Sequence, residues 1–258
     1  MAIHKTDLNL FPEEYLLNED EMGRTTVQFE LIHYLVSVLE WLFHNEKWHI
    51  AGNLEFYHPA VKNSQNKITP DISVFKGVFL SPYDKQTLSS WDIVPDQDEM
   101  PPVVFEISSR STWRSDILNG ENNKPAIYGR MGIKEYFAYD PNEPPVWKSK
   151  RSRRLLGWRY ENGQLVEIEP DGSSRLWSNE LNSWLVPDGP ILRLYDRENN
   201  LRLTEKEAQE KQSRAKDLTI EVLGTTIQTM NSTIESMSER IAEMERQLRE
   251  LKGEKDQA

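Results

Sequence analysis

The sequence contains no cysteine. Disulfide bonds, thiol nucleophiles and cysteine-based zinc sites are therefore excluded, and the composition fits a reducing cytoplasm. No uninterrupted apolar run approaches the length that crosses a membrane, and the first residues lack the basic-then-apolar order of a signal peptide. We therefore expect a cytoplasmic protein without a membrane partner.

Positive charge is also scarce. The chain has 31 Lys and Arg against 42 Asp and Glu, which gives a formal net charge of −11. This sign is wrong for a protein that coats nucleic acid without specificity. Contact with nucleic acid would need a local basic patch, and residues 148–154 (Lys-Ser-Lys-Arg-Ser-Arg-Arg) offer one. The same run equally fits a solvated hairpin tip.

Three regions differ in composition. Residues 1–24 are polar and acidic and are expected to form an extended lead-in. Residues 25–202 form the predicted domain, which begins with a helix over residues 27–43 whose apolar positions recur at helical spacing. Residues 203–258 are predicted to form one long helix.

Two acids lie in or beside predicted strands. Glu106 stands inside the apolar run 103–107, where an unpaired ionised carboxylate would cost several kcal/mol, so it needs a partner. Asp71 follows Pro70 and precedes another apolar strand. If the two strands pair as neighbours, both carboxylates converge at one end of a sheet. Such an oxygen-rich pocket suits a hard divalent cation.

A lysine follows these acids along the chain. Lys124 begins a predicted short helix, with Pro125 in its first turn and Gly132 at its C-terminal end. Residues 133–139 then predict a third strand, which ends at an Asp-Pro turn. Asp116, in the connection before this helix, is interpreted as a surface residue rather than an acid at the rim of the site.

Four motifs follow one another in order: Pro70-Asp71, Glu106-Ile107-Ser108-Ser109, Lys124-x-x-x-Tyr128-x-x-x-Gly132 and Asp140-Pro141. From about Thr25 to about Tyr195 the chain resembles a bacterial family of restriction endonucleases in the PD-(D/E)XK nuclease superfamily. The resemblance implies an α/β fold, with a restriction-endonuclease-like mixed sheet core flanked by helices.

The resemblance also implies metal-dependent endonuclease activity, which is the hydrolysis of phosphodiester bonds. DNA is the expected substrate, and Mg²⁺, or alternatively Mn²⁺, is the expected cofactor. Asp71, Glu106 and the backbone carbonyl of Ile107 would bind the metal, and Lys124 would orient or deprotonate the attacking water. Ser108 stands where the superfamily has its usual lysine, and the resemblance suggests that Lys124 replaces it from the following helix.

The remaining elements of the domain are predicted to extend the same sheet. Residues 48–57 are expected to form one strand in a hairpin with the Asp71 strand, and Glu30 is interpreted as a surface or core-edge residue. Further strands are expected at 146–147, 155–160, 165–170 and 191–196, with a short closing element at 176–185.

The C-terminal helix carries a heptad pattern. Thr204 and Glu207 form a capping box at its start, and Gly253 suggests its end. Apolar residues alternate steps of four and three between Ile220 and Leu251, with Ile mostly at a and Leu or Met at d. This seam predicts a coiled-coil homodimer through residues 220–251. The alternative is a helix that folds back on its own domain.

A second functional hypothesis stays open from the residues alone. The fold could be a catalytically inactive nuclease-like interaction module that oligomerises through its coiled coil. Ser108 and the negative charge favour this alternative, while the retained Asp71, Glu106 and Lys124 oppose it.

Overall fold

A computed structural model describes residues 25–61, 67–78, 88–92, 100–118, 120–147, 153–161 and 164–255. The chain divides into two compact units, Met1–Thr204 and Glu205–Ala258. The predicted lead-in over residues 1–24 and the basic residues 148–152 lie outside the described residues.

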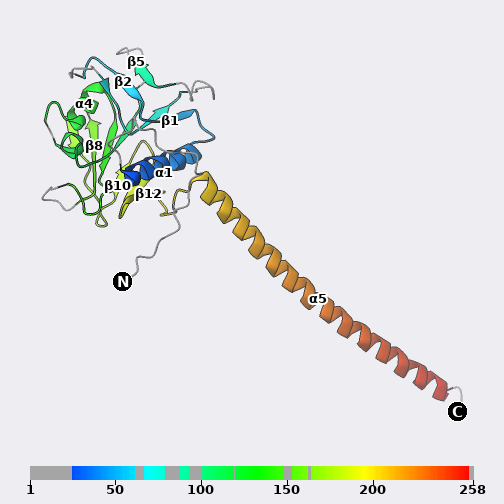
Figure 1. Ribbon diagram of the computed structural model, residues 1–258. Helices are drawn as coiled ribbons and strands as arrows, with labels where there is room; N and C mark the ends of the chain where they lie inside the picture. The colour runs from blue at the N-terminus through cyan, green and yellow to red at the C-terminus, as the bar shows by residue number, and fades with distance from the viewer. Residues whose placement is uncertain are drawn as a thin grey trace. The chain divides into compact units, whose positions relative to one another are not determined.

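The first unit is built on a six-stranded mixed sheet (Figure 1). The strand order is β1-β4-β6-β7-β8-β9, and only β6 and β7 are parallel. The predicted mixed α/β fold is confirmed. The strands are β1 (Trp48–Gly52), β4 (Ile72–Lys76), β6 (Val103–Ile107), β7 (Glu135–Tyr139), β8 (Leu155–Glu161) and β9 (Gln164–Glu167).

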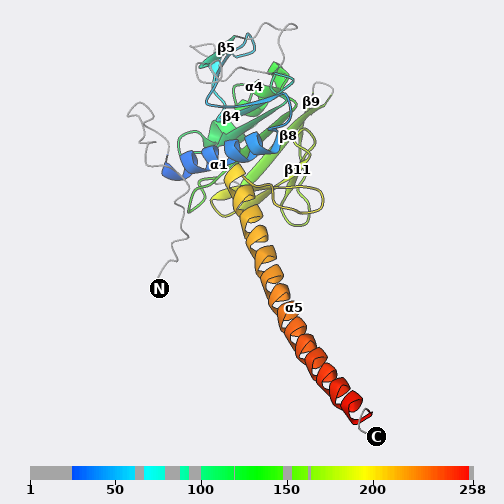
Figure 2. The same cartoon turned by 90° about the vertical axis from the view of Figure 1, so that its right-hand side faces the viewer.

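Both faces of this sheet are covered, so its central strands are buried on two sides. Helix α1 (Thr26–Leu42) packs on one face, where Val103, Phe105 and Ile107 of β6 point (Figure 2). Helices α3 (Trp113–Ile117) and α4 (Lys124–Met131) cover the other face, toward which Val104 points. Because side chains alternate along a strand, Glu106 also faces α3 and α4.

The predicted strand over residues 48–57 proved to be two strands in different sheets. Asn53 adopts a φ of 56° and interrupts the strand after Gly52. β2 (Glu55–Tyr57) then pairs with β3 (Lys67–Ile68) and β5 (Ser90–Asp92) in a separate three-stranded sheet, while β1 pairs antiparallel with β4.

One predicted sheet assignment and one predicted strand were wrong. β10 (Leu176–Ser178), β11 (Ser183–Asp188) and β12 (Ile191–Tyr195) form a third sheet of their own, which packs on the α1 face of the domain instead of extending the large sheet. Val146 and Trp147 form no strand. Their backbone N–H groups donate to the Asp140 carboxylate at 2.6 and 2.9 Å, so they are not available for a strand ladder.

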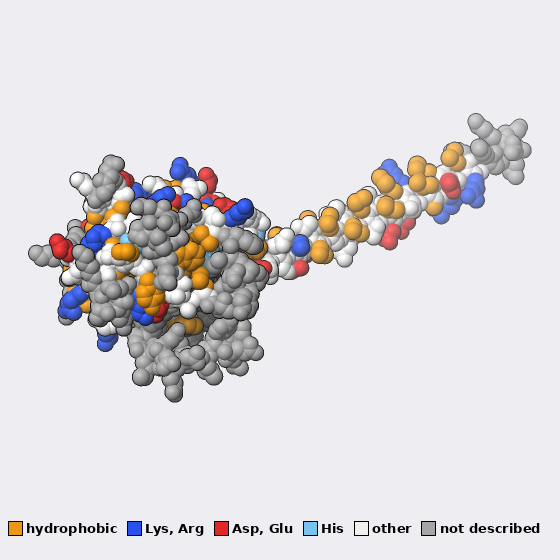
Figure 3. Space-filling model, turned by 90° about the horizontal axis from the view of Figure 1, so that it is seen from above, with side chains coloured by type: hydrophobic (Ala, Val, Ile, Leu, Met, Phe, Trp, Pro, Cys, Tyr) orange, Lys and Arg blue, Asp and Glu red, His pale blue; other side chains and the backbone are white. Residues whose placement is uncertain are grey.

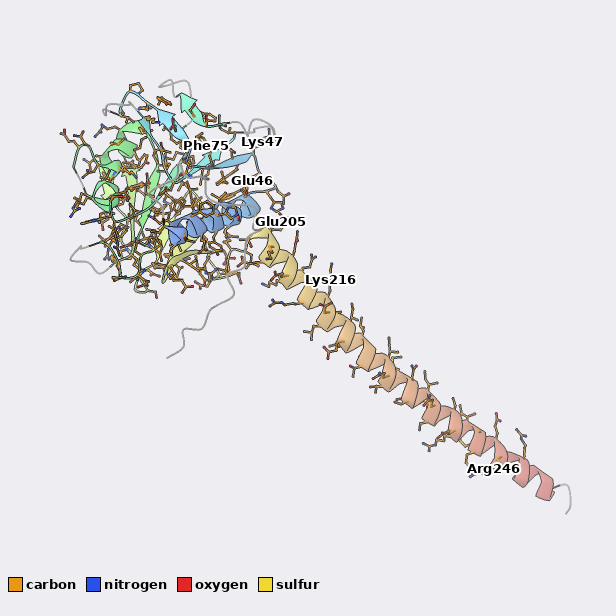
Figure 4. The ribbon with its side chains drawn as sticks, in the orientation of Figure 1. Glu46, Lys47, Phe75, Glu205, Lys216 and Arg246 are labelled. Atoms are coloured by element: carbon orange, nitrogen blue, oxygen red, sulfur yellow. The ribbon has the colours of Figure 1, made fainter. Side chains whose placement is uncertain are left out.

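The second unit is helix α5 (Glu205–Lys255), 51 residues long. It begins directly after Thr204 and continues through Gly253, so the predicted stop at that glycine was wrong. Side chains such as Lys216 and Arg246 project from it along its length (Figure 4). Among the helices in the described part of the chain, none is long and apolar enough to span a membrane.

Candidate functional site

Asp71 and Glu106 meet at the end of two neighbouring strands. β4 and β6 pair antiparallel with Ile72 opposite Phe105, which places Asp71 beside the last residues of β6. The Asp71 Oδ2 atom accepts a hydrogen bond from the backbone N–H of Ile107 at 2.7 Å. Both acids are buried, with 7% and 2% exposure respectively. The structure thus brings together the two acids that the sequence predicted as neighbours.

Helix α4 supplies the partners that Glu106 needs. Lys124 Nζ lies 2.8 Å from Glu106 Oε2, and the Tyr128 hydroxyl donates to Glu106 Oε1 at 2.5 Å. Lys124 and Tyr128 are four residues apart, so they lie on the same side of the helix. Pro125 stands in the first turn of α4, and Gly132 ends it with a φ of 87°, as the sequence predicted.

Two contacts with Tyr160 of β8 fix α4 against the sheet. The Tyr160 hydroxyl donates to the backbone carbonyl of Pro125. One turn further along, the Tyr160 ring lies so close to Gly129 that any Cβ at this position would overlap it. A glycine is therefore required here to let the helix approach, and this approach sets the distance between Lys124 and the strand that carries Glu106.

Asp116 completes the site, contrary to its interpretation as a surface residue. It is 1% exposed, and its Oδ1 atom lies 2.9 Å from Lys124 Nζ. Its Oδ2 atom accepts hydrogen bonds from Ser108 Oγ at 2.8 Å and from Thr112 Oγ1 at 2.9 Å. The signal in the sequence was the spacing of Thr112 and Asp116, which puts both side chains on one side of a helical turn.

Ser108 is thus connected to Lys124 through one carboxylate. The Ser108 hydroxyl and the Lys124 ammonium bind different oxygens of the same Asp116 carboxylate. Ser108 is fully buried, and its backbone carbonyl accepts a hydrogen bond from Asn142 at 2.9 Å. This serine therefore serves to orient Asp116 within the site.

The surroundings change the protonation of these groups. The pKa of Glu106 is raised to about 8, mainly by burial, with Asp71 and Asp116 acting in the same direction and Lys124 opposing them. Burial disfavours the charged form of Lys124, but Glu106, Asp116 and Asp71 together raise its pKa above the ordinary range of a lysine. Lys124 is therefore a stable cation, whereas Glu106 takes up a proton near neutral pH.

The backbone carbonyl of Ile107 is held from the other face of the sheet. Gln28, a buried residue in the first turn of α1, donates from Nε2 to this carbonyl at 3.1 Å. The side-chain oxygen of Gln28 also accepts from the backbone N–H of Thr25, as part of a capping box that begins the helix. No local sequence pattern predicted this role. Glu30, which it placed at the surface or core edge, is partly exposed.

The chemistry of the site fits a divalent cation. The predicted ligands are two carboxylates and one carbonyl, all hard oxygen donors. Once Glu106 has released its proton, three ionised carboxylates and one ammonium give the cluster a formal charge of −2, which Mg²⁺ would neutralise. Within the described residues, no three Asp, Glu, His or Cys side chains converge as metal ligands. A metal here would therefore depend on Asp71, Glu106 and the main chain of Ile107.

A surface pocket of about 580 Å³ lies where β6 and β7 end. Polar residues in its wall include Thr25, Ser109, Arg110, Ser111 and Asn142. Because β6 and β7 are parallel, the loops that follow them share one edge of the sheet, next to Ile107 and Ser108.

The basic run predicted at residues 148–154 is described only at its end. Arg153 lies 3.8 Å from Glu167, and Arg154 lies 2.5 Å from Glu143. These two arginines are therefore paired with acids of the same domain. The other members of the run lie outside the described residues.

A mixed sheet with two acids at adjoining strand ends and a lysine from the next helix defines a restriction-endonuclease-like α/β protein. The chain belongs to the Uma2 family, whose model, described as "Putative restriction endonuclease", matches residues 21–185. The predicted resemblance is thereby confirmed. No curated protein matches the sequence. The matched range contains the whole site, while α5 lies outside it.

Proposed function

We propose that this protein is a metal-dependent endonuclease that hydrolyses phosphodiester bonds in DNA. One observation carries the proposal: the Lys124 ammonium is held between the Glu106 and Asp116 carboxylates, at 2.8 and 2.9 Å, beside Asp71. A buried cluster of acids around one lysine has a clear use in phosphodiester chemistry. Membership of a family described as restriction endonucleases supports the same activity.

Asp71, Glu106 and the Ile107 carbonyl would hold Mg²⁺ or Mn²⁺ in this proposal. The bound ion would supply Lewis acidity at the phosphoryl group and lower the pKa of a bound water. Gln28 orients the Ile107 carbonyl, and the Ile107 N–H orients Asp71. With the Tyr128 hydroxyl bound to Glu106, each of the three ligands is positioned by a hydrogen bond.

Lys124 acts as a cation in the proposed reaction. Its raised pKa opposes the expectation that it deprotonates the attacking water. The ammonium instead orients the substrate phosphate and stabilises the negative charge that develops on its oxygens. Asp116 fixes Lys124 in place, and Ser108 and Thr112 fix Asp116 in turn. Tyr128 is a positioning residue for Glu106.

DNA and a second copy of the chain are the proposed partners. The pocket beyond β6 and β7, whose wall includes both Arg110 and Glu143, offers a path for a nucleic-acid strand at the edge of the sheet where these strands end. Pairing through residues 220–251 of α5 would bring two sites together, and cutting a duplex requires two cuts. The cytoplasmic setting expected from the absence of cysteine stays a prediction.

The inactive interaction module is the competing function. Both oxygens of Glu106 are engaged by protein donors, Tyr128 and Lys124, as a structural ion-pair network would require. In that case metal would neither bind nor stabilise the protein, and the function would depend on α5.

Cleavage of supercoiled plasmid in Mg²⁺ or Mn²⁺ tests the proposal. We expect the wild type to nick or linearise DNA, and Glu106→Ala and Lys124→Ala to lose this activity. Lys134→Ala is the matched control, because Lys134 is 65% exposed and lies outside the site. If the wild type cuts neither DNA nor a matched RNA with either ion, the interaction module is the better account.

A further inference from the structure

Helix α5 presents a continuous row of exposed apolar side chains. Exposure along this row ranges from 49% at Met244 to 66% at Ile220. Figure 3 shows the row as hydrophobic side chains that follow one another along the helix. We call it the α5 seam. Its described members are Ile220, Leu223, Ile227, Met230, Ile234, Met237, Ile241, Met244 and Leu248. Apolar surface of this extent is stable in water only when another surface covers it.

We propose that a second copy of this chain covers the α5 seam in a parallel, in-register coiled coil. This inference rests on the pairing proposed above, to which it adds the orientation of the two helices, and it does not depend on nuclease activity. The first support is the residue pattern. The a positions from 220 to 241 are all isoleucine, and the d positions are Leu223 followed by three methionines. β-branched residues at a with unbranched β carbons at d favour two parallel strands.

Uncharged side chains flank most of the seam. Between residues 219 and 238 the e and g positions hold only Thr, Gly, Asn and Ser, so no charge there selects an orientation. The hydroxyls of Thr219, Thr226 and Thr233 at g each donate to the backbone carbonyl four residues earlier. The hydroxyl hydrogen bonds of these threonines are made within their own helix, and their uncharged side chains lie beside the α5 seam.

The first charged flanking residues are Arg240 at g and Glu245 at e. In a parallel, in-register pair, a g residue faces the e residue of the next heptad on the other helix. Arg240 then faces Glu245 of the second copy, and two-fold symmetry makes this pair twice. In an antiparallel pair, e faces e and g faces g, so these two residues would not meet. Glu245 also lies 3.6 Å from Arg249 of its own helix, an exposed pair that contributes little.

Parallel pairing has a consequence for the nuclease-like domains. Each domain is joined to the same, N-terminal end of α5. Both domains would therefore lie at one end of the coiled coil, where they can act on one duplex. An antiparallel pair would separate them by the length of the helix.

Single cysteines test the orientation in the full chain, because the protein has no cysteine of its own. We expect Met230→Cys and Ile241→Cys each to form disulfide-linked dimers on mild oxidation, since equivalent d residues, and equivalent a residues, face each other in a parallel pair. A mixture of the two variants, one carrying a size tag, should give no mixed dimer. Glu239→Cys, at the outward f position, is the control and should not cross-link.

Each other result has a distinct meaning. A mixed dimer of Met230→Cys with Ile241→Cys, without the two homodimers, would show an antiparallel pair, in which a residues face d residues, and would overturn the orientation. No cross-linking by either variant, together with monomer mass in sedimentation, would overturn both the orientation and the pairing. Metal-dependent plasmid cleavage by the same preparation would leave the nuclease proposal standing in either case.

A charge exchange tests the reason for the orientation. Arg240→Glu or Glu245→Arg places like charges opposite each other twice, so we expect the dimer dissociation constant to rise roughly tenfold for each variant. Mixing the two variants restores both attractive pairs and should favour the mixed dimer. Unchanged dissociation constants would show that these residues do not face each other.

Discussion

Ser108 Oγ donates a hydrogen bond at 2.8 Å to the Asp116 carboxylate, whose other oxygen lies 2.9 Å from Lys124 Nζ. Ser108 and Lys124 are therefore connected through one acid. In the proposed reaction, Ser108 acts by orienting the carboxylate that holds the Lys124 ammonium in place.

Removing the charge of Asp116 should impair turnover more than substrate binding. In Asp116→Asn, Lys124 keeps only Glu106 as a close anionic partner, so its ammonium is less well positioned. We expect kcat to fall roughly ten- to hundredfold with little change in KM for DNA. Single-turnover cleavage measures the effect. Asp188→Asn, at a 65% exposed acid, is the control, and equal rates in both variants would remove Asp116 from the mechanism.

Ser108→Ala should have a smaller effect than Asp116→Asn. Thr112 still donates to the same carboxylate oxygen, so Asp116 keeps one of its two hydroxyl partners. We expect a loss of about 1 kcal/mol in unfolding free energy and a cleavage rate reduced by less than roughly tenfold. The double variant Ser108→Ala, Thr112→Ala should approach Asp116→Asn. Urea unfolding and cleavage rates of the three variants decide whether the hydroxyls act through Asp116.

Metal-free protein should lose stability as the pH rises toward 8. Glu106 keeps its proton up to about pH 8 when folded, whereas the unfolded chain releases it at the ordinary pKa of a glutamate. The unfolded state then binds fewer protons than the folded state, so the unfolding free energy falls with increasing pH. The slope is on the order of 1 kcal/mol per pH unit across this interval. Unfolding of the wild type and of Glu106→Gln in EDTA at several pH values separates the contribution of Glu106, because the variant has no carboxyl proton to release at this position.

Divalent metal should stabilise the protein through Asp71 and Glu106. At a concentration of roughly 100 times the dissociation constant, the expected gain is about 2.7 kcal/mol. Because bound metal displaces the Glu106 proton, the gain should increase as the pH rises toward 8. Thermal unfolding with Mn²⁺ or Mg²⁺ measures it, and Asp71→Asn should abolish it. A shift that persists in Asp71→Asn and Glu106→Gln would locate the metal elsewhere.

Gly129→Ala should disturb the site from outside it. The added Cβ would overlap the Tyr160 ring and force α4, which carries Lys124 and Tyr128, away from the sheet. We expect a loss of about 1–3 kcal/mol in stability and a slower cleavage rate. Gly172→Ala is the matched control, because a Cβ there meets no neighbouring atom. Unchanged activity in Gly129→Ala would mean that α4 can shift without moving its lysine.

The parts of the fold that depend on local sequence patterns could be predicted from the sequence. Pro125 and Gly132 define the ends of a short helix by backbone geometry alone, and α4 lies between them. The apolar run around Glu106 predicted a strand buried on both faces, and β6 is such a strand. Its acid needed a partner for reasons of desolvation, and Lys124 and Tyr128 meet that need.

The features that could not be predicted depend on contacts between segments that are distant in the sequence. Asn53 turns the chain out of the large sheet. β2 then belongs to another sheet, where its parallel neighbour is β5, within residues 88–92 and more than thirty positions away. Gln28 reads as an ordinary capping residue, and its bond to Ile107 spans 79 positions. Asp116 lies in a polar stretch between two predicted elements, which suggested exposure. Its carboxylate is buried because Ser108 and Lys124, from two other segments, supply hydrogen-bond donors to it.

The packing of α4 against Tyr160 determines where the Lys124 side chain lies. A lysine at position 108 would be placed by the hydrogen-bonded ladder of β6, which sheet pairing holds in register. Lys124 is placed instead by how a helix rests on one aromatic ring, with Gly129 as the point of closest approach. In the proposed reaction, the position of the lysine thus depends on side-chain packing rather than on strand pairing. A substitution of Tyr160, remote in sequence from the acids of the site, would therefore alter or abolish the activity without changing any charged group of the site.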